Sequence, residues 1–219
     1  MAAGVLFDVD GTLVDTNYHH VVAWADAFER AGHRVPMSRL HGLIGQGSER
    51  LVETVLGHTD EAIVDGHADF YAPRLQRLQP FDGAADLLRK CKDSGLTVVL
   101  ATSAASHDAE HMLDTLGVAD VVDHVTTNDD ADASKPAPDI VEAALEACGL
   151  KAADCVFIGD SVWDVKAAQR AGMPCIGVLT GGIDERVLRE AGAHSIFEGV
   201  RDLLERFQDS LLGELVAAA

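Results

Sequence analysis

The sequence predicts an α/β fold, with a doubly wound, Rossmann-like parallel sheet as the core and an inserted α-helical cap domain. Three observations support this fold class. A short apolar run over residues 4–7 ends in an acidic turn, which is typical of a buried strand. No β-branched strand run follows between Thr16 and Gln79, whereas helical and strand patterns alternate from residue 80 onward. Alternating βα units form a parallel sheet that helices cover on both faces.

The segment after the first strand is expected to be entirely helical. Apolar residues recur at helical spacing until Gly32 ends the first helix, and Asp15 or Thr16 can cap its start. Two more helices are expected here, over Ser48–Leu56 and over about Asp60–Leu78. We therefore expect residues 16–79 to form the cap, and residues 1–15 with 80–219 to form the core.

Helices and strands are expected to alternate through the rest of the chain. The expected helices are Gly83–Asp93, Ser106–Leu116, Pro138–Cys148, Trp163–Ala171 and Val200–Leu212. The expected strands are Leu96–Ala101, Val121–Thr126, Cys155–Ile158, Pro174–Val178 and, with a weaker signal, His194–Phe197. In such a sheet, ligands bind in the crevice outside the carboxyl ends of the strands.

Composition limits the function classes. The chain has 219 residues, a 47% hydrophobic fraction and a net charge of −19, which argues against nucleic acid or an anionic membrane as the main partner. It has no apolar run of membrane-spanning length and no signal-type segment, so we expect a cytoplasmic protein, either a monomer or a small homo-oligomer. The cysteines lack metal-ligand spacing and are expected to be buried, reduced thiols: Cys91, Cys148, Cys155 and Cys175.

Carboxylates follow two of the expected strands. Asp8 and Asp10 end the first strand, and Asp160 and Asp164 follow a later one. Taken alone, the first pair would suit an ordinary turn before Gly11. If all four carboxylates lie at one edge of the sheet, however, they would repel each other by roughly 1–4 kcal/mol per close pair. Such a cluster takes up protons or binds a cation, and oxygen donors without His or Cys favour Mg²⁺.

Two further polar residues suit phosphate. Thr102 ends another apolar run shortly before a helix start, where a hydroxyl and free backbone amides can hold a phosphate. Lys135 can contact phosphate oxygens as a point charge. Taken alone, Thr102 would be a helix N-cap and Lys135 a solvated loop residue. However, the order in which Thr102, Lys135 and the two acidic pairs occur along the chain favours a catalytic role for both residues.

The two carboxylates of the first strand suit different steps of phosphoryl transfer. Asp8, the last residue of a rigid strand, is the better nucleophile and can form an aspartyl phosphate. Asp10, on the turn, can protonate the leaving oxygen and then deprotonate the attacking water. The predicted catalytic residues are therefore Asp8, Asp10, Thr102 and Lys135.

Together these stretches resemble the four motifs of the haloacid dehalogenase (HAD) superfamily. They are Asp8-Val9-Asp10-Gly11-Thr12-Leu13, the strand ending in Thr102-Ser103, Lys135-Pro136-Ala137-Pro138-Asp139, and Gly159-Asp160-Ser161 with Asp164. The likeness covers almost the whole chain. Within the superfamily the chain resembles the phosphoglycolate phosphatase and β-phosphoglucomutase-like branch, whose helical cap lies between the first two motifs. Residues 16–79 match that cap in place and character.

The resemblance implies a Mg²⁺-dependent phosphatase that hydrolyses a small phosphorylated metabolite, of the phosphoglycolate or sugar-phosphate type, through an aspartyl-phosphate intermediate. It implies that the Asp8 side chain, the Asp10 backbone carbonyl and Asp160 hold the metal, with Asp164 supporting the site. An acid at Asp10 argues against the dehalogenase and phosphonatase branches, which lack one there. Substrate contacts in the core are expected from Thr102, Ser103 and Lys135.

The cap is expected to choose the substrate, with His20 and Arg50 as substrate-binding candidates. His20 lies where β-phosphoglucomutases carry a His tied to cap closure, although a solvated surface His is an equal alternative. Those mutases read a second phosphate with a cap-loop Arg, but here Ser48 occupies the nearest position. Gln46 and Glu49 are further cap-loop candidates. The remaining histidines are expected to be structural or solvated: His19, His33, His41, His58, His67, His107, His111, His124 and His194.

Two rival functions stay open at this stage. A β-phosphoglucomutase-like phosphomutase would pass the phosphoryl group to a second sugar hydroxyl instead of water, and Ser48 disfavours it. A non-catalytic phospho-acceptor module is the weaker rival, because it needs neither a second acid two residues later nor an inserted helical unit. The expected partner is a small phosphomonoester, whose identity depends on cap-loop geometry.

Overall fold

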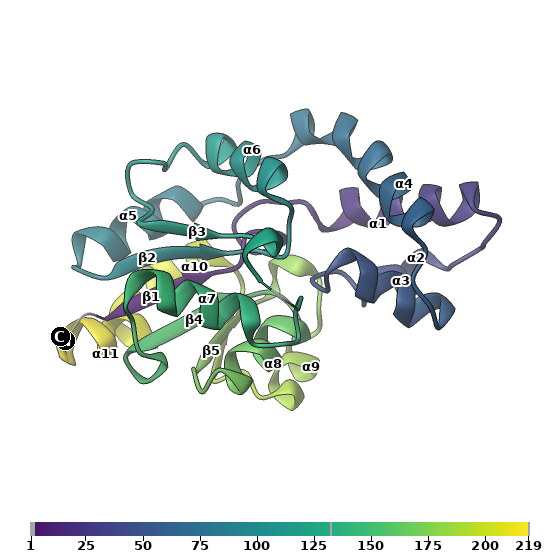
Figure 1. The fold of residues 1–219 in the computed structure, drawn as a ribbon. Helices are drawn as coiled ribbons and strands as arrows, with labels where there is room; N and C mark the ends of the chain where they lie inside the picture. Colours follow the sequence, from purple (N-terminus) through teal and green to yellow (C-terminus); the bar gives the residue numbers. More distant parts are fainter. Residues whose placement is uncertain (1–2, 132, 219) are drawn as a thin grey trace.

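The computed structural model describes residues 3–131 and 133–218, so both outer bounds of the expected core, residues 1 and 219, lie outside the described residues. The chain forms a parallel six-stranded sheet in the order β3-β2-β1-β4-β5-β6 (Figure 1). The strands are β1 (Gly4–Phe7), β2 (Thr97–Ala101), β3 (His124–Thr126), β4 (Cys155–Gly159), β5 (Cys175–Val178) and β6 (Ser195–Phe197). The sequence runs outward from β1 in both directions, which confirms the predicted doubly wound fold and places its switch point between β1 and β4.

The central strand is apolar because both of its faces are covered. Val5 pairs in register with Val98 of β2 and Val156 of β4, and all residues of β1 are buried. Side chains alternate between the faces, so Phe7 joins Val5 in one hydrophobic core while Leu6 belongs to the other. The sheet is therefore held from both sides.

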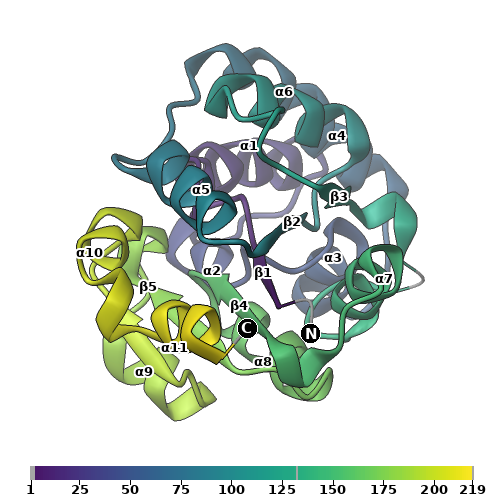
Figure 2. The ribbon, with the colours of Figure 1, turned by 90° about the vertical axis from the view of Figure 1, so that its left-hand side faces the viewer.

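Helices complete the two cores. On one side lie α5 (Ala84–Asp93), α6 (Ser106–Leu116), α10 (Val200–Glu205) and α11 (Leu211–Ala218). On the other lie α7 (Asp139–Cys148), α8 (Val162–Arg170) and α9 (Glu185–Ala191). Figure 2 shows α5 and α10 on the opposite side of the strands from α7 and α8. None of the helices in the described part of the chain is long and apolar enough to cross a membrane.

A helical segment with a core of its own lies beyond the carboxyl ends of the strands (Figure 1). It contains α1 (Asn17–Arg30), α2 (Met37–His41), α3 (Ser48–Leu56), α4 (Glu61–Tyr71) and the 3₁₀ turn η1 (Ala72–Arg77). Trp24 and Phe28 of α1 pack with Leu51 of α3 and Ile63 of α4 in this small core. The expected absence of strands between Thr16 and Gln79 is confirmed among these residues.

The helical segment joins the sheet through two connections that pair with each other. The Asp15 amide donates to the Gln79 carbonyl and the Phe81 amide donates to the Leu13 carbonyl, both at 2.9 Å. Thr16 occupies the N-cap position of α1, but its side chain makes no capping hydrogen bond, so that predicted cap is wrong.

Several predicted elements have different bounds. The strand predicted over Val121–Thr126 begins only at His124, because the amides of Val121 and Val122 bond back to the Val118 carbonyl in a turn. The helix predicted over Asp60–Leu78 changes to a 3₁₀ turn after Tyr71, where Pro73 lacks an amide donor. The short helices α2 and α9 were not predicted at all.

The helix predicted over Val200–Leu212 is interrupted. It ends after Glu205, and a 3₁₀ turn over Phe207–Asp209 leads to a new helix at Leu211. The Ser210 hydroxyl causes the break, since it donates to the Phe207 carbonyl at 2.7 Å and accepts from the Leu212 amide at 3.2 Å. A serine that bonds to the backbone in this way competes with helix continuation.

The cysteines are free thiols, and three of them are buried as predicted: Cys91, Cys155 and Cys175. Burial raises the pKa of Cys91 to about 12 and that of Cys155 to about 11. Cys148 is only partly buried, so the prediction of full burial is wrong there.

Candidate active site

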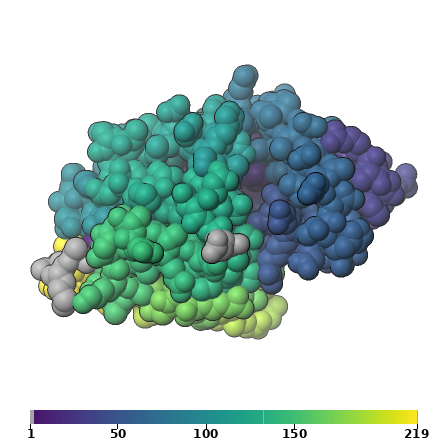
Figure 3. Space-filling view, in the orientation of Figure 1, coloured from purple at the N-terminus to yellow at the C-terminus, as the bar shows by residue number. Residues whose placement is uncertain are grey.

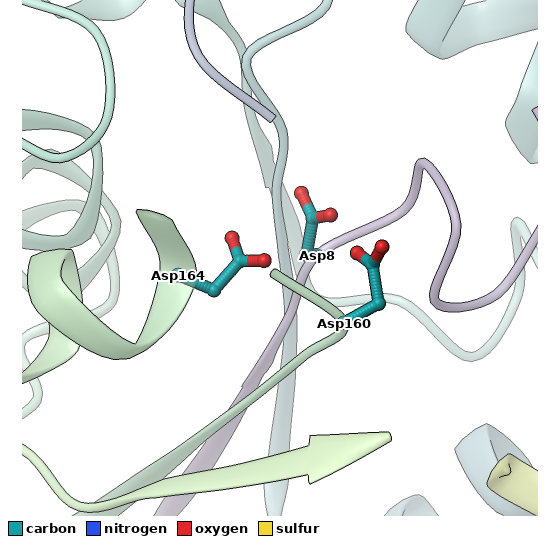
Figure 4. Close-up of side chains that lie close together, drawn as sticks. All are labelled: Asp8, Asp160 and Asp164. Carbon is teal, nitrogen blue, oxygen red and sulfur yellow. The ribbon is translucent and has the colours of Figure 1, made fainter. Parts of the chain in front are cut away.

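Three aspartates converge at the carboxyl edge of the sheet (Figure 4). Asp8 follows β1, Asp160 follows β4, and Asp164 lies in the first turn of α8. One carboxylate oxygen of each lies within 4.8 Å of the others, and all three side chains are buried. Burial and the charge of Asp164 raise the pKa of Asp8 well above its usual value, and the same two causes raise the pKa of Asp160 to about 7.

Lys135 supplies the positive charge within this cluster. Its Nζ lies 2.5 Å from Oδ1 of Asp8 and 2.8 Å from Oδ1 of Asp164, although the second contact lacks hydrogen-bond alignment. Burial favours the neutral amine, but the two carboxylates outweigh it and raise the pKa of Lys135. Lys135 was predicted to contact substrate phosphate; its described partners are the aspartates themselves.

The donor set fits a hard divalent cation. One buried ammonium faces the three carboxylates of Asp8, Asp160 and Asp164, which leaves a negative charge that burial makes unfavourable. The side chains that form the cluster offer only oxygen, and Mg²⁺ prefers oxygen ligands. A bound cation would favour the charged carboxylates and so oppose the rise in the pKa of Asp8 and Asp160.

Residues from distant parts of the chain orient Asp160. Thr12 donates to Oδ1 at 3.2 Å, and Asn17 at the start of α1 donates to Oδ2 at 2.9 Å. The Gly181 carbonyl beside Asp160 accepts a 2.7 Å hydrogen bond from Nε2 of His41 in α2. Sequence reasoning missed Asn17 and assigned no functional contact to His41. Only Thr12 carried a signal, because it belongs to the first motif.

Asp164 is held by a capping box at the start of α8. The Ser161 amide and hydroxyl donate to Oδ2 of Asp164 at 3.0 and 2.6 Å, and the Asp164 amide donates to the Ser161 hydroxyl at 3.3 Å. This arrangement leaves Oδ1 of Asp164 to face Lys135. The spacing of Ser161 and Asp164 matches the capping-box signature, so the sequence did contain this signal.

Asp10 has a different environment from the other acids. Its Oδ2 accepts a hydrogen bond from the Thr102 hydroxyl at 3.1 Å, and its Oδ1 lies 3.2 Å from Nε2 of His20. Burial would raise the pKa of Asp10, but the hydrogen bond and electrostatic attraction of His20, with the Thr102 hydrogen bond, lower it. Thr102 is not an N-cap; its hydroxyl accepts from the Ala104 amide at 3.1 Å and connects that loop to Asp10.

The histidine next to Asp10 belongs to a buried ring stack in the helical segment. Nδ1 of His20 lies 3.0 Å from Nε2 of His67 in α4. The His20 ring stacks on Tyr71 with centroids 3.9 Å apart, and the His67 ring stacks on Trp24 with centroids 4.0 Å apart. His20 is therefore not a solvated surface residue. His67 was not predicted to contribute to the site, and it contacts the histidine that binds Asp10.

The helical segment packs closely over the site, and Figure 3 shows it in contact with the sheet domain. A Cβ at Gly45 would lie 2.8 Å from the Ser161 hydroxyl, and a Cβ at Gly47 would overlap Ser134, the neighbour of Lys135. Between these glycines, Gln46 is buried and its Nε2 has no hydrogen-bond partner among the described residues.

The other two predicted substrate contacts differ in exposure. Arg50 lies on the exposed side of α3, outside the acidic cluster, and its backbone carbonyl accepts from the Thr54 hydroxyl at 2.8 Å. The hydroxyl of Ser103, which follows Thr102 in the loop after β2, is buried without a partner among the described residues. Ser103 therefore keeps a free hydroxyl close to the site, whereas nothing places Arg50 beside it.

The doubly wound sheet, with buried carboxylates at its switch point, defines an α/β protein of the kind that binds ligands at the carboxyl ends of its strands. The chain belongs to the haloacid dehalogenase-like hydrolase family, whose model matches residues 2–172. Its similarity to phosphoglycolate phosphatases agrees with the expected branch, and a β-phosphoglucomutase-like structure from Bacteroides vulgatus, 23% identical, shares the fold. The resemblance read from the four motifs is thus confirmed.

Individual relatives agree with this assignment. The chain is 31% identical to validoxylamine A 7′-phosphate phosphatase of Streptomyces hygroscopicus subsp. limoneus, covering 85% of this chain and 89% of the relative. It is 31% identical to a phosphoglycolate phosphatase of Xylella fastidiosa (strain Temecula1), covering 81% and 80%. It is also 30% identical to part of the much longer chloroplastic protein SUPPRESSOR OF QUENCHING 1 of Arabidopsis thaliana. That match covers 92% of this chain but only 20% of the relative. A crystal structure of a hydrolase from Pseudomonas syringae superposes with a TM-score of 0.89 at 31% identity, covering 94% and 98%.

Proposed function

We propose that this protein is a Mg²⁺-dependent phosphatase that hydrolyses a small phosphorylated metabolite, of the phosphoglycolate or sugar-phosphate type. The observation that carries the proposal is the buried cluster of Asp8, Asp160, Asp164 and Lys135, with a separate carboxylate, Asp10, beside it. Its relatives include named phosphatases of phosphorylated small molecules, which supports the same reaction class.

Asp8 is the nucleophile in this proposal. An oxygen of its carboxylate bonds to phosphorus, the bond from phosphorus to the ester oxygen breaks, and an aspartyl phosphate results. The strand-end position and the Lys135 contact hold this carboxylate in one orientation. Lys135 also keeps a positive charge beside the oxygens of the transferring phosphoryl group, where negative charge gathers.

Asp10 moves the protons. In the first step it gives the departing ester oxygen the proton that it gained in the previous turnover, and it then takes a new proton from the water that attacks phosphorus and releases phosphate. The hydrogen bonds from Thr102 and His20 set its orientation before substrate binds. Its side chain stands apart from the three-aspartate cluster, which suits a group that transfers protons.

Mg²⁺ would be held by the Asp8 side chain, Asp160 and the Asp10 backbone carbonyl, while Asp164 positions Lys135. When bound, it neutralises charge on the phosphoryl oxygens during transfer. Thr12 and Asn17 hold the Asp160 carboxylate in place for that role.

Residues 16–79 act as the cap in this proposal, and residues 1–15 with 80–219 act as the core. The paired connections at Asp15 and Gln79 form the hinge, and closure excludes bulk water from the site. Gln46 offers a buried, unpaired amide donor to the organic part of the substrate, and His20 reaches Asp10 from the same side. Ser103 offers its free hydroxyl, and Arg50 contributes only at the rim.

The test is phosphate release from p-nitrophenyl phosphate and from a panel of metabolite phosphates, with Mg²⁺ and with excess chelator. We expect Asp8→Asn to lose nearly all turnover while remaining folded, and Asp82→Asn, an exposed partner of Arg201, to keep wild-type rates. Full activity in chelator, or a fully active Asp8→Asn variant, would contradict the proposal. In a further arm, conversion of β-glucose 1-phosphate to glucose 6-phosphate with a bisphosphate primer would indicate the mutase instead.

A further inference from the structure

A hydrogen-bonded chain leads from Asp10 into the interior of the helical segment. Oδ1 of Asp10 faces Nε2 of His20 at 3.2 Å, and Nδ1 of the same ring faces Nε2 of His67 at 3.0 Å. Both nitrogens of His20 are therefore engaged by groups from different elements. His67 is only 8% exposed and lies between the rings of Trp24 and His20.

The chemistry of the three groups sets the direction of donation. A carboxylate oxygen accepts, so Nε2 of His20 must carry the proton that faces Asp10. In its neutral form the His20 ring carries only one proton, and Nδ1 of that form is an acceptor. Nε2 of His67 is then the donor to it. Burial, the largest cause, lowers the pKa of His67 well below its usual value, so His67 is a neutral partner.

We propose that His67 is a positioning residue for Asp10, because its Nε2–H group fixes His20 as the tautomer that donates to the Asp10 carboxylate. This inference rests on the proposed role of Asp10 in proton transfer. A histidine ring is oriented by the hydrogen bond that its second nitrogen makes. Without His67, the His20 ring keeps its stacking on Tyr71 but loses the bond that selects its tautomer and rotation.

The consequence concerns the leaving group. A metabolite alcohol departs poorly without a proton, whereas p-nitrophenolate departs readily as an anion. Misplacing Asp10 should therefore slow the hydrolysis of phosphoglycolate and similar alkyl phosphates more than that of p-nitrophenyl phosphate. The loss should appear in kcat, since neither His67 nor His20 is needed to hold the phosphoryl group.

The experiment compares His67→Phe, which keeps an aromatic ring without a donor, with His67→Gln, which keeps an amide donor. His111→Gln is the matched control, because His111 is a half-buried histidine whose side chain, among the described residues, bonds only to the Leu75 carbonyl, at 3.0 Å. Ring ¹⁵N shifts of His20 at about pH 8, above the usual titration range of imidazoles, report which nitrogen carries the proton. This readout does not require turnover.

We expect wild-type His20 to be protonated at Nε2 alone, and His67→Phe to show a mixed or changed tautomer. His67→Phe should lose about tenfold to a hundredfold in kcat on alkyl phosphates, part of the hundred- to ten-thousand-fold that acid–base catalysis supplies. KM should change less than about twofold. His67→Gln should recover part of the lost kcat, and His111→Gln should keep the wild-type kcat. Protonated Nδ1 in wild type, or an unchanged His20 tautomer in folded His67→Phe, would overturn the proposal. Absence of phosphatase activity in wild type would overturn the proposed function instead and leave the tautomer result standing.

Discussion

At the residue scale, His67 differs from most other histidines of the chain because its imidazole is buried. The His67 side chain is almost fully enclosed by aromatic rings, so a charge on it would be poorly solvated. Its pKa is accordingly lowered well below the usual value, first by burial and then by His20. The same burial that makes it a fixed neutral partner for His20 makes the fold sensitive to acid.

This sensitivity predicts a pH profile of stability. Below about pH 6.5 the unfolded chain binds a proton at His67 that the folded chain does not, so the free energy of unfolding falls as pH decreases. The free energy of unfolding begins to fall near pH 6.5 and continues to fall down to the folded-state pKa of His67. Above about pH 6.5, His67 has no effect on stability. Urea denaturation between about pH 7.5 and 5 should show a steeper decline for wild type than for His67→Phe.

The matched control for the pH profile is Trp24→Phe, which alters the ring packed on His67 without removing a titratable group. It should lower stability at every pH but keep the wild-type slope. Parallel profiles for wild type and His67→Phe would mean that His67 is protonated equally in the folded and unfolded chains.

At the element scale, the site depends on turns that allow close approach. Gly11 has a φ of +74°, which other residues rarely adopt, and a Cβ there would lie 2.6 Å from Oδ2 of Asp160. Gly181, in the 3₁₀ turn η4 (Leu179–Gly181) after β5, would overlap the same carboxylate if it carried a methyl group. Two turns from different strands thus confine Asp160.

Gly181→Ala should therefore damage metal binding. The added methyl must displace Asp160, because the Gly181 backbone belongs to a turn fixed by hydrogen bonds from Asn17 and His41. We expect the Mg²⁺ concentration for half-maximal activity to rise about tenfold or more, with stability lower by about 1–3 kcal/mol as in other overpacked sites. Activity titrated with Mg²⁺ and urea denaturation measure the two effects.

Gly42→Ala is the control for this turn. A Cβ at Gly42 would lie 3.7 Å from the Arg39 carbonyl, an ordinary contact, and Gly42 also ends a short helix. It should leave the Mg²⁺ requirement unchanged. If Gly181→Ala and Gly42→Ala behaved alike, Asp160 would not be confined by the η4 turn.

At the scale of the whole molecule, charge opposes compactness. The chain carries a net charge of −19, and three of its carboxylates are gathered in one buried cluster. Self-repulsion of this kind destabilises a folded protein, and a cation that binds only the folded state offsets it.

Mg²⁺ should therefore raise the thermal stability of the protein after metal removal. At a hundred times its Kd, a ligand specific to the folded state adds about 2.7 kcal/mol. For a chain of this size that corresponds to a rise in Tm of roughly 5–10 °C. Differential scanning fluorimetry in chelator and in excess Mg²⁺, with sodium chloride at matched ionic strength, separates specific binding from screening. Asp160→Asn should abolish most of the rise; an equal rise in that variant would assign the effect to surface charge.

Local pattern determined the sheet and the motif residues of this protein. Each of Asp8, Thr102 and Asp160 ends a short apolar run, and such runs become strands because both faces of a parallel sheet are buried. Parallel strands bring their carboxyl ends to one edge, so the convergence of these groups followed from their positions along the chain. Local pattern did not predict a helix break caused by a single side chain, such as the one at Ser210 within the last predicted helix. Serine is compatible with a helix until its hydroxyl bonds to the backbone.

Only the tertiary structure decided which residues surround these motifs. His67 lies 47 residues from His20, and Asn17 lies 143 residues from Asp160, yet each pair shares a hydrogen bond. Sequence periodicity reports which face of an element is apolar, over distances of two to four residues along the chain. It carries no information about which polar group packing will bring from another element. The acids of the site were therefore visible in the sequence, while the groups that orient them depended on how the helical segment packs over the sheet.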